Sequence, residues 1–139
     1  LGGTTQCEET RRLRSLDNVF FLGRRPYEEL PHYVKGLDVG LIPLKLNRLT
    51  ASINPLKLYE YMAAGCPIVS TPIREVLRFN GLVNIARGVS QFEREVESLL
   101  NGRGRRTSQL LIEEARKHSW ARLTSDMIVH LEQTLGKRG

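Results

Sequence analysis

The sequence has 139 residues, which is enough for one domain and too few for two of ordinary size. Hydrophobic residues make up 40% of it and charged residues 26%, a balance that excludes an intrinsically disordered chain. No apolar run approaches the roughly 20 residues that a membrane-spanning helix needs. The net charge of +6 favours an anionic partner: nucleic acid, an acidic membrane surface or a phosphate-bearing small molecule.

The start of the chain and its cysteines indicate the cellular setting. The chain opens on Leu1-Gly2-Gly3, with no initiator methionine and no signal-peptide pattern, so we expect it to be a piece of a longer protein. Cys7 and Cys66 cannot form a disulfide framework, which predicts a reducing, cytoplasmic compartment. The few aspartates and the scattered histidines offer no D-x-D or other metal-ligand spacing, so no metal site is predicted.

In the first half of the chain, short aliphatic runs alternate with segments of helical period. In chain order this predicts a helix over residues 8–15, a buried strand over 18–23 and a helix over 26–36. A strand over 37–43 follows, and its nearly continuous apolar run is typical of strands buried on both faces.

The second half continues the alternation. After a polar loop, the pattern predicts a helix that stops at Gly65, a strand over 66–70, a short helix over 74–79 and a last strand over 82–86. Ser90 and Glu93 are spaced as a capping box that opens the next helix. Two closing helices follow, split near Ser119. The second carries an apolar stripe that we expect to be packed, formed by Trp120, Leu123, Met127, Leu131 and Leu135. The alternative is that the stripe lies against a missing half of a two-domain parent, which would leave an exposed apolar patch on this chain. The whole order predicts an α/β fold, a Rossmann-like parallel sheet with flanking helices.

Residues 45–71 carry the predicted chemistry, because a polar loop with Thr50 and Ser52 follows the carboxyl end of a strand. Asn54 is placed as an N-cap with Pro55 at the first helical position, and Lys57 adds a positive charge in the first turn. Such a helix N-terminus can bind a phosphate or diphosphate. The alternative is that Asn54 only caps the helix and Lys57 is solvated, which these residues alone would favour.

Glu60 lies one turn after Lys57 on the same helical face. Its carboxylate could accept hydrogen bonds from two vicinal hydroxyls of a sugar. The alternative is an ordinary ion pair with Lys57, worth only a few tenths of a kcal/mol.

The run over residues 54–71, from Asn54-Pro55-Leu56-Lys57 to Ser70-Thr71, closely resembles the donor-binding helix and following strand of GT-B glycosyltransferases of the group 1 family. These are retaining enzymes that use nucleotide sugars. Blocks at 18–23, 26–31 and 37–43 agree in order and spacing, as does Ser119-Trp120 at the start of the last helix. The resemblance covers nearly the whole chain and is specific as a composite.

The resemblance implies roles for particular residues. Glu60 would hold the ribose hydroxyls, and Lys57 would face the diphosphate, so these two are the expected catalytic residues. The other expected substrate-binding residues are Arg24 near the nucleobase, Thr50 and Ser52 in the loop, and Asn54, Pro55 and Leu56 against the diphosphate and donor sugar. Arg24 and Arg25 have an equally weighted alternative as a pair of exposed arginines. Glu60 matches the second glutamate of a pair in the family, and Ser52 stands where the first glutamate of that pair often is. Which residue contacts the hydroxyls of the donor sugar is therefore left open.

The resemblance also implies what lies outside the sequence. The donor domain of the family begins with a glycine-rich strand that nothing here matches, and Leu1-Gly2-Gly3 resembles the end of the second strand. In a doubly wound sheet ordered 3-2-1-4-5-6, the absent first strand is the central one. The N-terminal acceptor domain is absent as well. We therefore expect residues 1–139 to be a single donor-binding domain that cannot catalyse transfer alone.

The expected substrate is a UDP- or GDP-linked sugar, with no cofactor, and the expected partners are the missing acceptor domain and an acidic membrane surface. Family context implies bacterial surface polysaccharide synthesis at the cytoplasmic face of the membrane. The competing hypothesis is a non-catalytic basic α/β module that binds nucleic acid or a nucleotide. We do not favour nucleic acid, because no basic platform interleaved with aromatic residues is present.

Overall fold

The computed structural model describes residues 8–102 and 107–136. The chain divides into two compact units, one up to Leu30 and one from Pro31 onward, and each is described separately below. The predictions made for Leu1-Gly2-Gly3 and for Cys7 lie outside the described residues.

The first unit contains helix α1 (Glu8–Arg14), as predicted, and the short 3-10 helix η1 (Tyr27–Glu29), which continues into α2 (Leu30–Lys35). The strand predicted over residues 18–23 is wrong, because this segment is neither helix nor strand and the side chain of Phe20 is 79% exposed. A strand persists only where a neighbour accepts its hydrogen bonds. In the predicted 3-2-1-4-5-6 order this segment is the third strand, which is adjacent to none of the strands present in the structure.

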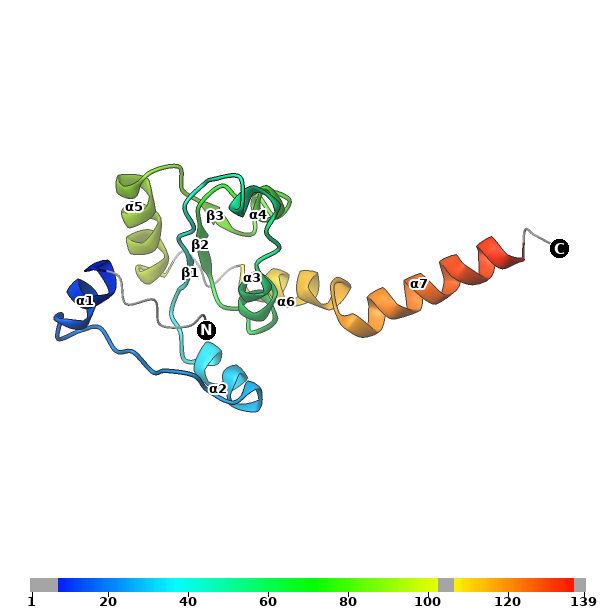
Figure 1. Ribbon diagram of the computed structural model, residues 1–139, viewed down its shortest axis with the longest axis horizontal. Coiled ribbons are helices and arrows are strands. Elements are labelled where there is room, and N and C mark those ends of the chain that lie inside the picture. The colour runs from blue at the N-terminus through cyan, green and yellow to red at the C-terminus, as the bar shows by residue number, and fades with distance from the viewer. Residues whose placement is uncertain (1–7, 103–106, 137–139) are drawn as a thin grey trace. The chain divides into compact units, whose positions relative to one another are not determined.

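The second unit is built on a three-stranded parallel sheet of β1 (Gly40–Ile42), β2 (Ile68–Ser70) and β3 (Asn84–Ile85), in that order (Figure 1). Helix α3 (Leu56–Ala63) connects β1 to β2, and α4 (Arg74–Leu77) connects β2 to β3. In the register Leu41 pairs with Val69, and Ser70 pairs with Ile85. The predicted α/β fold is confirmed, but the predicted burial of β1 on both faces is wrong, since Leu41 is exposed.

Helices cover both faces of the sheet. Ile68 of β2 joins a core cluster with Leu58 and Met62 of α3 and Leu111 of α6 (Ser108–Lys117). The next residue, Val69, points to the opposite face because successive strand residues alternate. There it packs in a second cluster that includes Leu99 of α5 (Val89–Leu100).

Helix α3 is fixed at both ends by its sequence. Pro55 is the N-cap residue, one position later than predicted, so Asn54 precedes the cap and makes no capping hydrogen bond there. The helix ends as predicted, because Gly65 has a φ of +68° and takes the left-handed conformation of a C′ glycine. Gly40 of β1 lets the helix approach the sheet: a Cβ atom at this position would lie 2.5 Å from the ring of Tyr61.

The predicted capping box of α5 is wrong. Gly88 is the N-cap residue, which places Ser90 inside the first turn. Gln91 fastens this end of the helix instead: its side-chain oxygen accepts from the Arg87 N–H at 3.0 Å, and its amide nitrogen donates to the Ile85 carbonyl at 3.1 Å. The longer amide side chain therefore ties α5 back to the end of β3.

Helix α7 (Trp120–Leu135) begins as predicted, with the hydroxyl of Ser119 accepting a hydrogen bond from the Arg122 N–H at 3.3 Å. The prediction that its apolar stripe is packed is wrong for the described part of the chain, since α7 contains no buried residue. The alternative, that a missing half of the protein covers the stripe, stays a prediction. No helix among the described residues is long and apolar enough to cross a bilayer.

Candidate functional site

The site lies at the carboxyl edge of the sheet, where open α/β folds bind ligands. The chain leaves the strands here in loops that are tied to one another. The hydroxyl of Thr71 donates to the Leu44 carbonyl at 2.8 Å, and the hydroxyl of Ser70 donates to the Thr71 carbonyl at 2.9 Å. The bond from Thr71 to Leu44 joins the segment after β2 to the loop over residues 43–55, which connects β1 to α3 and is called the β1–α3 loop below.

Thr50 holds the β1–α3 loop together. Its hydroxyl donates to the Lys45 carbonyl at 2.5 Å and accepts from the Asn47 N–H at 2.9 Å, while the Asn47 side-chain oxygen accepts from the Thr50 N–H at 2.9 Å. Thr50 is buried, and its hydroxyl is used within the loop. The contribution of Thr50 that the structure shows is therefore to shape the loop.

The first turn of α3 presents the other predicted groups. Backbone N–H groups at a helix N-terminus have no acceptor within the helix and carry partial positive charge. Leu56 and Lys57 are exposed in this turn, and Glu60 is half-buried one turn later. The ion pairs of the described residues do not include one between Lys57 and Glu60. Both charged groups are therefore available to a ligand along this face of α3.

Tyr59 connects α3 to α4. Its hydroxyl donates to a Glu75 carboxylate oxygen at 2.9 Å, and the same oxygen accepts from Arg78 at 2.8 Å. The Tyr59 ring packs edge-on against Phe79 and lies 5.4 Å from the ring of His118 in a tilted arrangement. Burial raises the pKa of Tyr59, the hydrogen bond and charge of Glu75 raise it further, and the charge of Arg78 opposes them. Tyr59 thus fixes α3 against its neighbours from a different face than the one that carries Lys57 and Glu60.

An open pocket of about 550 Å³ brings Ser52 and Asn54 together with residues of α4. From the sequence, residues 74–79 are predicted only as a short helix, with no role for their charged side chains. The pattern that could have indicated a role for this segment is the i,i+4 spacing of Arg74 and Arg78, which follow the carboxyl end of a strand. The pocket is lined here by Arg74 and Glu75 of α4 and by Arg78, the C-cap residue that follows it.

Arg24 belongs to the first unit. There it lines an open pocket of about 600 Å³ with Arg25, Pro26, Tyr27 and Leu30. It follows Gly23, whose φ of +72° turns the chain at this point. Seven of the eight predicted site residues therefore fall within residues 50–60 of the second unit, and Arg24 is described only within the first.

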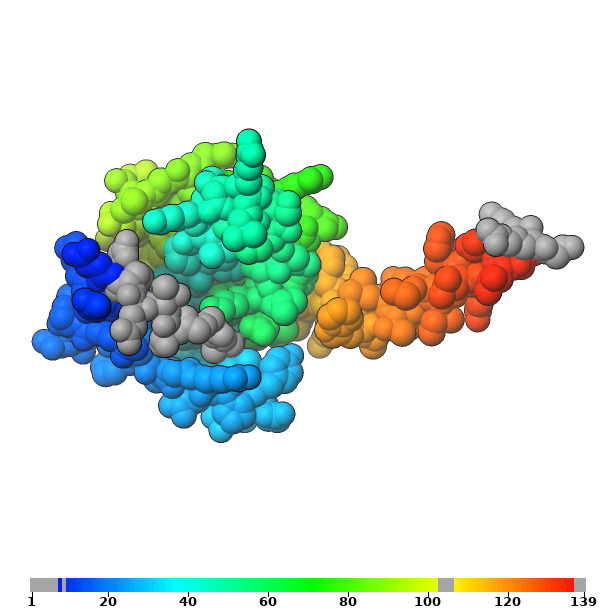
Figure 2. Space-filling model, viewed as in Figure 1, coloured from blue at the N-terminus to red at the C-terminus, as the bar shows by residue number. Residues whose placement is uncertain are grey.

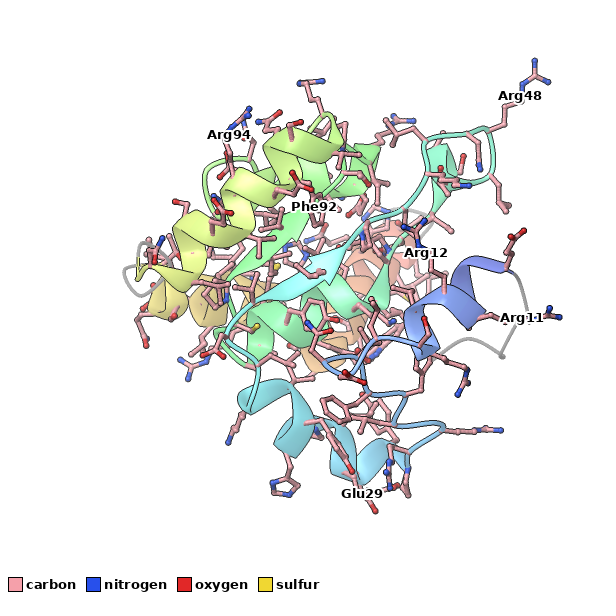
Figure 3. All side chains as sticks on the ribbon, turned by 90° about the vertical axis from the view of Figure 1, so that its left-hand side faces the viewer. Arg11, Arg12, Glu29, Arg48, Phe92 and Arg94 are labelled. Carbon is pink, nitrogen blue, oxygen red and sulfur yellow. The ribbon has the colours of Figure 1, made fainter. Side chains whose placement is uncertain are left out.

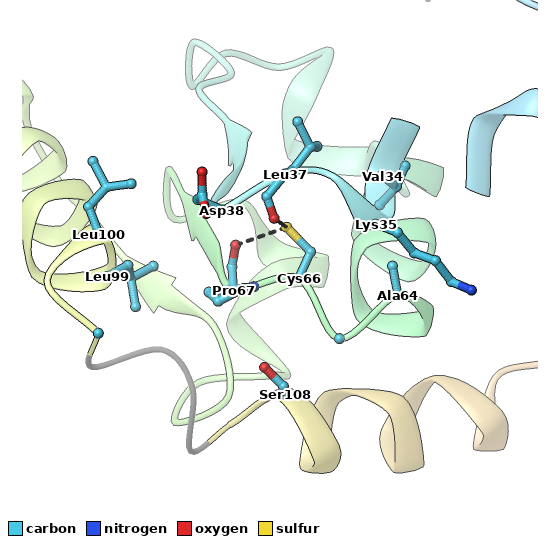
Figure 4. Close-up of a pocket in the computed structure, with 12 residues that line it drawn as sticks. Val34, Lys35, Leu37, Asp38, Ala64, Cys66, Pro67, Leu99, Leu100 and Ser108 are labelled. Atoms are coloured by element: carbon cyan, nitrogen blue, oxygen red, sulfur yellow. Dashed lines mark hydrogen bonds between the residues drawn. The ribbon is translucent and has the colours of Figure 1, made fainter. Parts of the chain in front are cut away.

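The opposite, amino edge of the sheet holds a further pocket of about 250 Å³, which includes Cys66 (Figure 4). The thiol donates to the carbonyls of Leu37 and Pro67. Burial raises the pKa of Cys66, which makes it a poor nucleophile. The described residues contain no group of three or more histidine, cysteine, aspartate or glutamate side chains placed to hold a metal ion.

Comparison with known proteins places this chain among glycosyltransferases. A stretch of 61 residues, 44% of the chain, is 39% identical to the putative teichuronic acid biosynthesis glycosyltransferase TuaH of Bacillus subtilis (strain 168). The stretch covers 15% of TuaH, so the chain spans only a small part of the length of this curated relative. No solved structure gives a significant match. Because residues 1–102 match the family described as glycosyl transferases group 1, the chain belongs to that family.

Proposed function

We propose that this chain is the donor-binding part of a retaining glycosyltransferase that takes a sugar from a UDP- or GDP-linked donor. The observation that carries the proposal is the start of α3. It follows the carboxyl end of β1 through a loop that is closed on itself, and it presents exposed Lys57 with half-buried Glu60 one turn further on. This arrangement suits a diphosphate followed by a ribose.

In the proposed mechanism the helix terminus and Lys57 stabilise the negative charge that develops on the departing diphosphate. Glu60 accepts hydrogen bonds from the two ribose hydroxyls and so fixes the orientation of the donor. Asn54, Pro55 and Leu56 form the surface beside the diphosphate and the donor sugar. Ser52 is exposed in η2 (Thr50–Ser52) and faces the donor sugar in this proposal. Arg24 contacts the nucleobase.

The acceptor side of the reaction would be supplied by the part of the protein that lies outside this chain. The relative TuaH is named for teichuronic acid biosynthesis. By extension, we place the reaction in bacterial surface polysaccharide synthesis, at the cytoplasmic face of an acidic membrane. The chain alone would bind the donor without transferring its sugar.

The test has a binding part and an activity part. Ligand-detected NMR of this chain with UDP, GDP and ADP should show binding of UDP or GDP that Lys57→Gln and Glu60→Gln each weaken. In the open reading frame that contains the chain, each substitution should lower sugar transfer by about 10²-fold or more, because each removes a group that contacts the diphosphate or ribose.

Lys35→Gln and Glu132→Gln are the matched controls, since both side chains are exposed and outside the site. Wild-type activity in both site variants would overturn the site assignment. Binding of DNA with a steep dependence on salt, without nucleotide binding, would instead favour the basic nucleic-acid module.

A further inference from the structure

One pocket of the second unit gathers charged side chains that the proposed function does not use. It lies between η2 and α4, has a volume of about 550 Å³ and is called the α4 pocket below. Helix α4 contacts η2, and in Figure 2 the green surface of α4 lies beside the blue-green surface of the β1–α3 loop. The polar residues that line the α4 pocket are Ser52, Asn54, Arg74, Glu75 and Arg78.

The charges that line the α4 pocket do not cancel. One oxygen of the Glu75 carboxylate accepts hydrogen bonds from Tyr59 at 2.9 Å and from Arg78 at 2.8 Å, so this carboxylate is already compensated. Arg74 is exposed, and its guanidinium has no hydrogen bond or ion pair with any residue that the structure describes. The pocket therefore keeps one positive charge without a counter-charge from the described residues.

Two guanidinium groups can reach one anion in this pocket. Arg74 and Arg78 are four positions apart, which places their Cβ atoms about 5–6 Å apart on one helical face. A guanidinium binds a carboxylate through two parallel N–H···O bonds. A neutral sugar presents only hydroxyls, which Ser52 and Asn54 can bind but which give Arg74 no counter-charge. The α4 pocket therefore suits a ligand that carries both hydroxyls and an anionic group.

The proposed function brings such a ligand to this place. Ser52 and Asn54 line the α4 pocket, and in the proposed function the same two residues lie against the donor sugar. Lys57 does not line the pocket, so the diphosphate position at the start of α3 is separate from it. A sugar that follows the diphosphate and contacts Ser52 and Asn54 extends toward Arg74.

We propose that the donor sugar is a hexuronic acid and that the α4 pocket selects it by its carboxylate. Arg74 binds the carboxylate with Arg78 beside it, and Ser52 and Asn54 bind hydroxyls of the ring. This inference names the substrate class of the proposed function and rests on it. The competing occupant of the pocket is the diphosphate of the donor, because the same two arginines could bind a phosphate.

The test compares two pairs of nucleotide sugars whose members differ only at C6 of the sugar. UDP-glucuronic acid is compared with UDP-glucose, and GDP-mannuronic acid with GDP-mannose, by calorimetric titration of the full chain. In the pair whose nucleotide the chain binds, the acid should bind about tenfold tighter or more, because its carboxylate adds charge-assisted hydrogen bonds to Arg74.

Arg74→Gln is the principal variant, because no contact of its guanidinium with the described residues is lost with it. It should reduce the preference for the acid to about twofold or less and leave the affinity for free UDP or GDP unchanged. Arg74→Lys keeps the charge without the planar guanidinium, and its preference should lie between those of the wild type and Arg74→Gln. Arg78→Gln is less informative, since it also removes the bond to Glu75.

Arg48→Gln is the matched control. Arg48 is an exposed cation of the β1–α3 loop that extends outward in Figure 3 and does not line the α4 pocket. The variant loses the same charge and should keep the full preference for the acid. An equal loss of preference in Arg48→Gln and Arg74→Gln would show that the preference reflects the net charge of the domain, which would overturn the inference.

The remaining outcomes separate the inference from the proposed function. Nucleotide binding with equal affinity for the acid and the neutral sugar, or with an unchanged preference in Arg74→Gln, overturns the inference alone. If Arg74→Gln weakens the binding of free UDP or GDP as much as that of the acid, the diphosphate occupies the α4 pocket and the inference is wrong. If no nucleotide or nucleotide sugar binds, the proposed function fails and the inference fails with it. Circular dichroism checks the fold of each variant, and the wild-type comparison still decides the outcome if a variant does not fold.

Discussion

In α3 the side chains of Leu58 and Met62 are fully buried between the sheet and α6, whereas along α7 an equally regular apolar stripe is exposed, with Met127 63% accessible. Both helices have the same periodicity, so the difference lies in what is packed against them. A helical stripe indicates which face can be buried, and only a partner element determines whether it is. The site helix owes its fixed position to such partners.

The largest expected effect tests this comparison directly. Met62→Ala should lower the free energy of unfolding by about 2–5 kcal/mol, because it removes a buried side chain and leaves a cavity against the sheet. Met127→Ala should change it by less than about 0.5 kcal/mol, because the side chain is exposed. Urea denaturation of the full chain measures both. A loss above about 1 kcal/mol for Met127→Ala would show that the stripe of α7 is covered in solution.

The parts of the fold that could be predicted from sequence are those determined by local chemistry. Gly65 ends α3 because the left-handed conformation favours glycine, and Ser119 starts α7 because its hydroxyl reaches a free N–H. At the N-terminus of α5 the prediction fails for a physical reason. Several polar residues compete to cap a helix: Ser90 had the expected spacing in α5, but Gln91 reaches back to β3.

What could not be predicted depends on contacts distant in sequence. The apolar run at residues 18–23 has the composition of a strand, yet a strand also requires a neighbour. At the site, the positions of Lys57 and Glu60 on one helix followed from their spacing. The bond from Tyr59 to Glu75, across sixteen positions, depends on how the chain folds back. The bonds by which Thr50 closes the loop are local, and they depend on a loop conformation that the residue types alone do not determine.

A smaller effect is expected at the contact between α3 and α4. Tyr59→Phe removes a hydrogen bond to a carboxylate and should cost about 1–2 kcal/mol, measured by urea denaturation. Tyr27→Phe, at an exposed tyrosine, is the matched control and should be neutral. An equal cost in both variants would mean that the bond to Glu75 contributes nothing to holding α3.

The same variant has a predicted pH dependence. Burial first, and then Glu75, raise the pKa of Tyr59 above its ordinary value of 10.0, so the folded state favours the neutral phenol. This contribution to stability is complete below the unfolded pKa and is lost as the pH rises through the folded pKa. The stability difference between wild type and Tyr59→Phe should therefore begin to shrink as the pH reaches 10.0 and continue to shrink until the pH has passed the higher pKa of the folded state. A stability difference that grows as the pH rises would mean that the folded state favours the ionised phenol, which contradicts the raised pKa of Tyr59.

The smallest effect concerns the helix whose stripe is exposed. Without buried residues, α7 depends on its cap and on intrinsic helix propensity. Ser119→Ala removes the hydrogen bond accepted from the Arg122 N–H, and should cost about 0.5–1 kcal/mol and speed hydrogen exchange in the first turns about two- to fivefold. Ser125→Ala makes the same chemical change inside the helix, where alanine has the higher propensity, and should slow exchange by up to about twofold. Opposite signs for the same substitution would show that local chemistry governs α7. Equal and negligible effects would mean that tertiary contacts hold this helix as firmly as they hold α3.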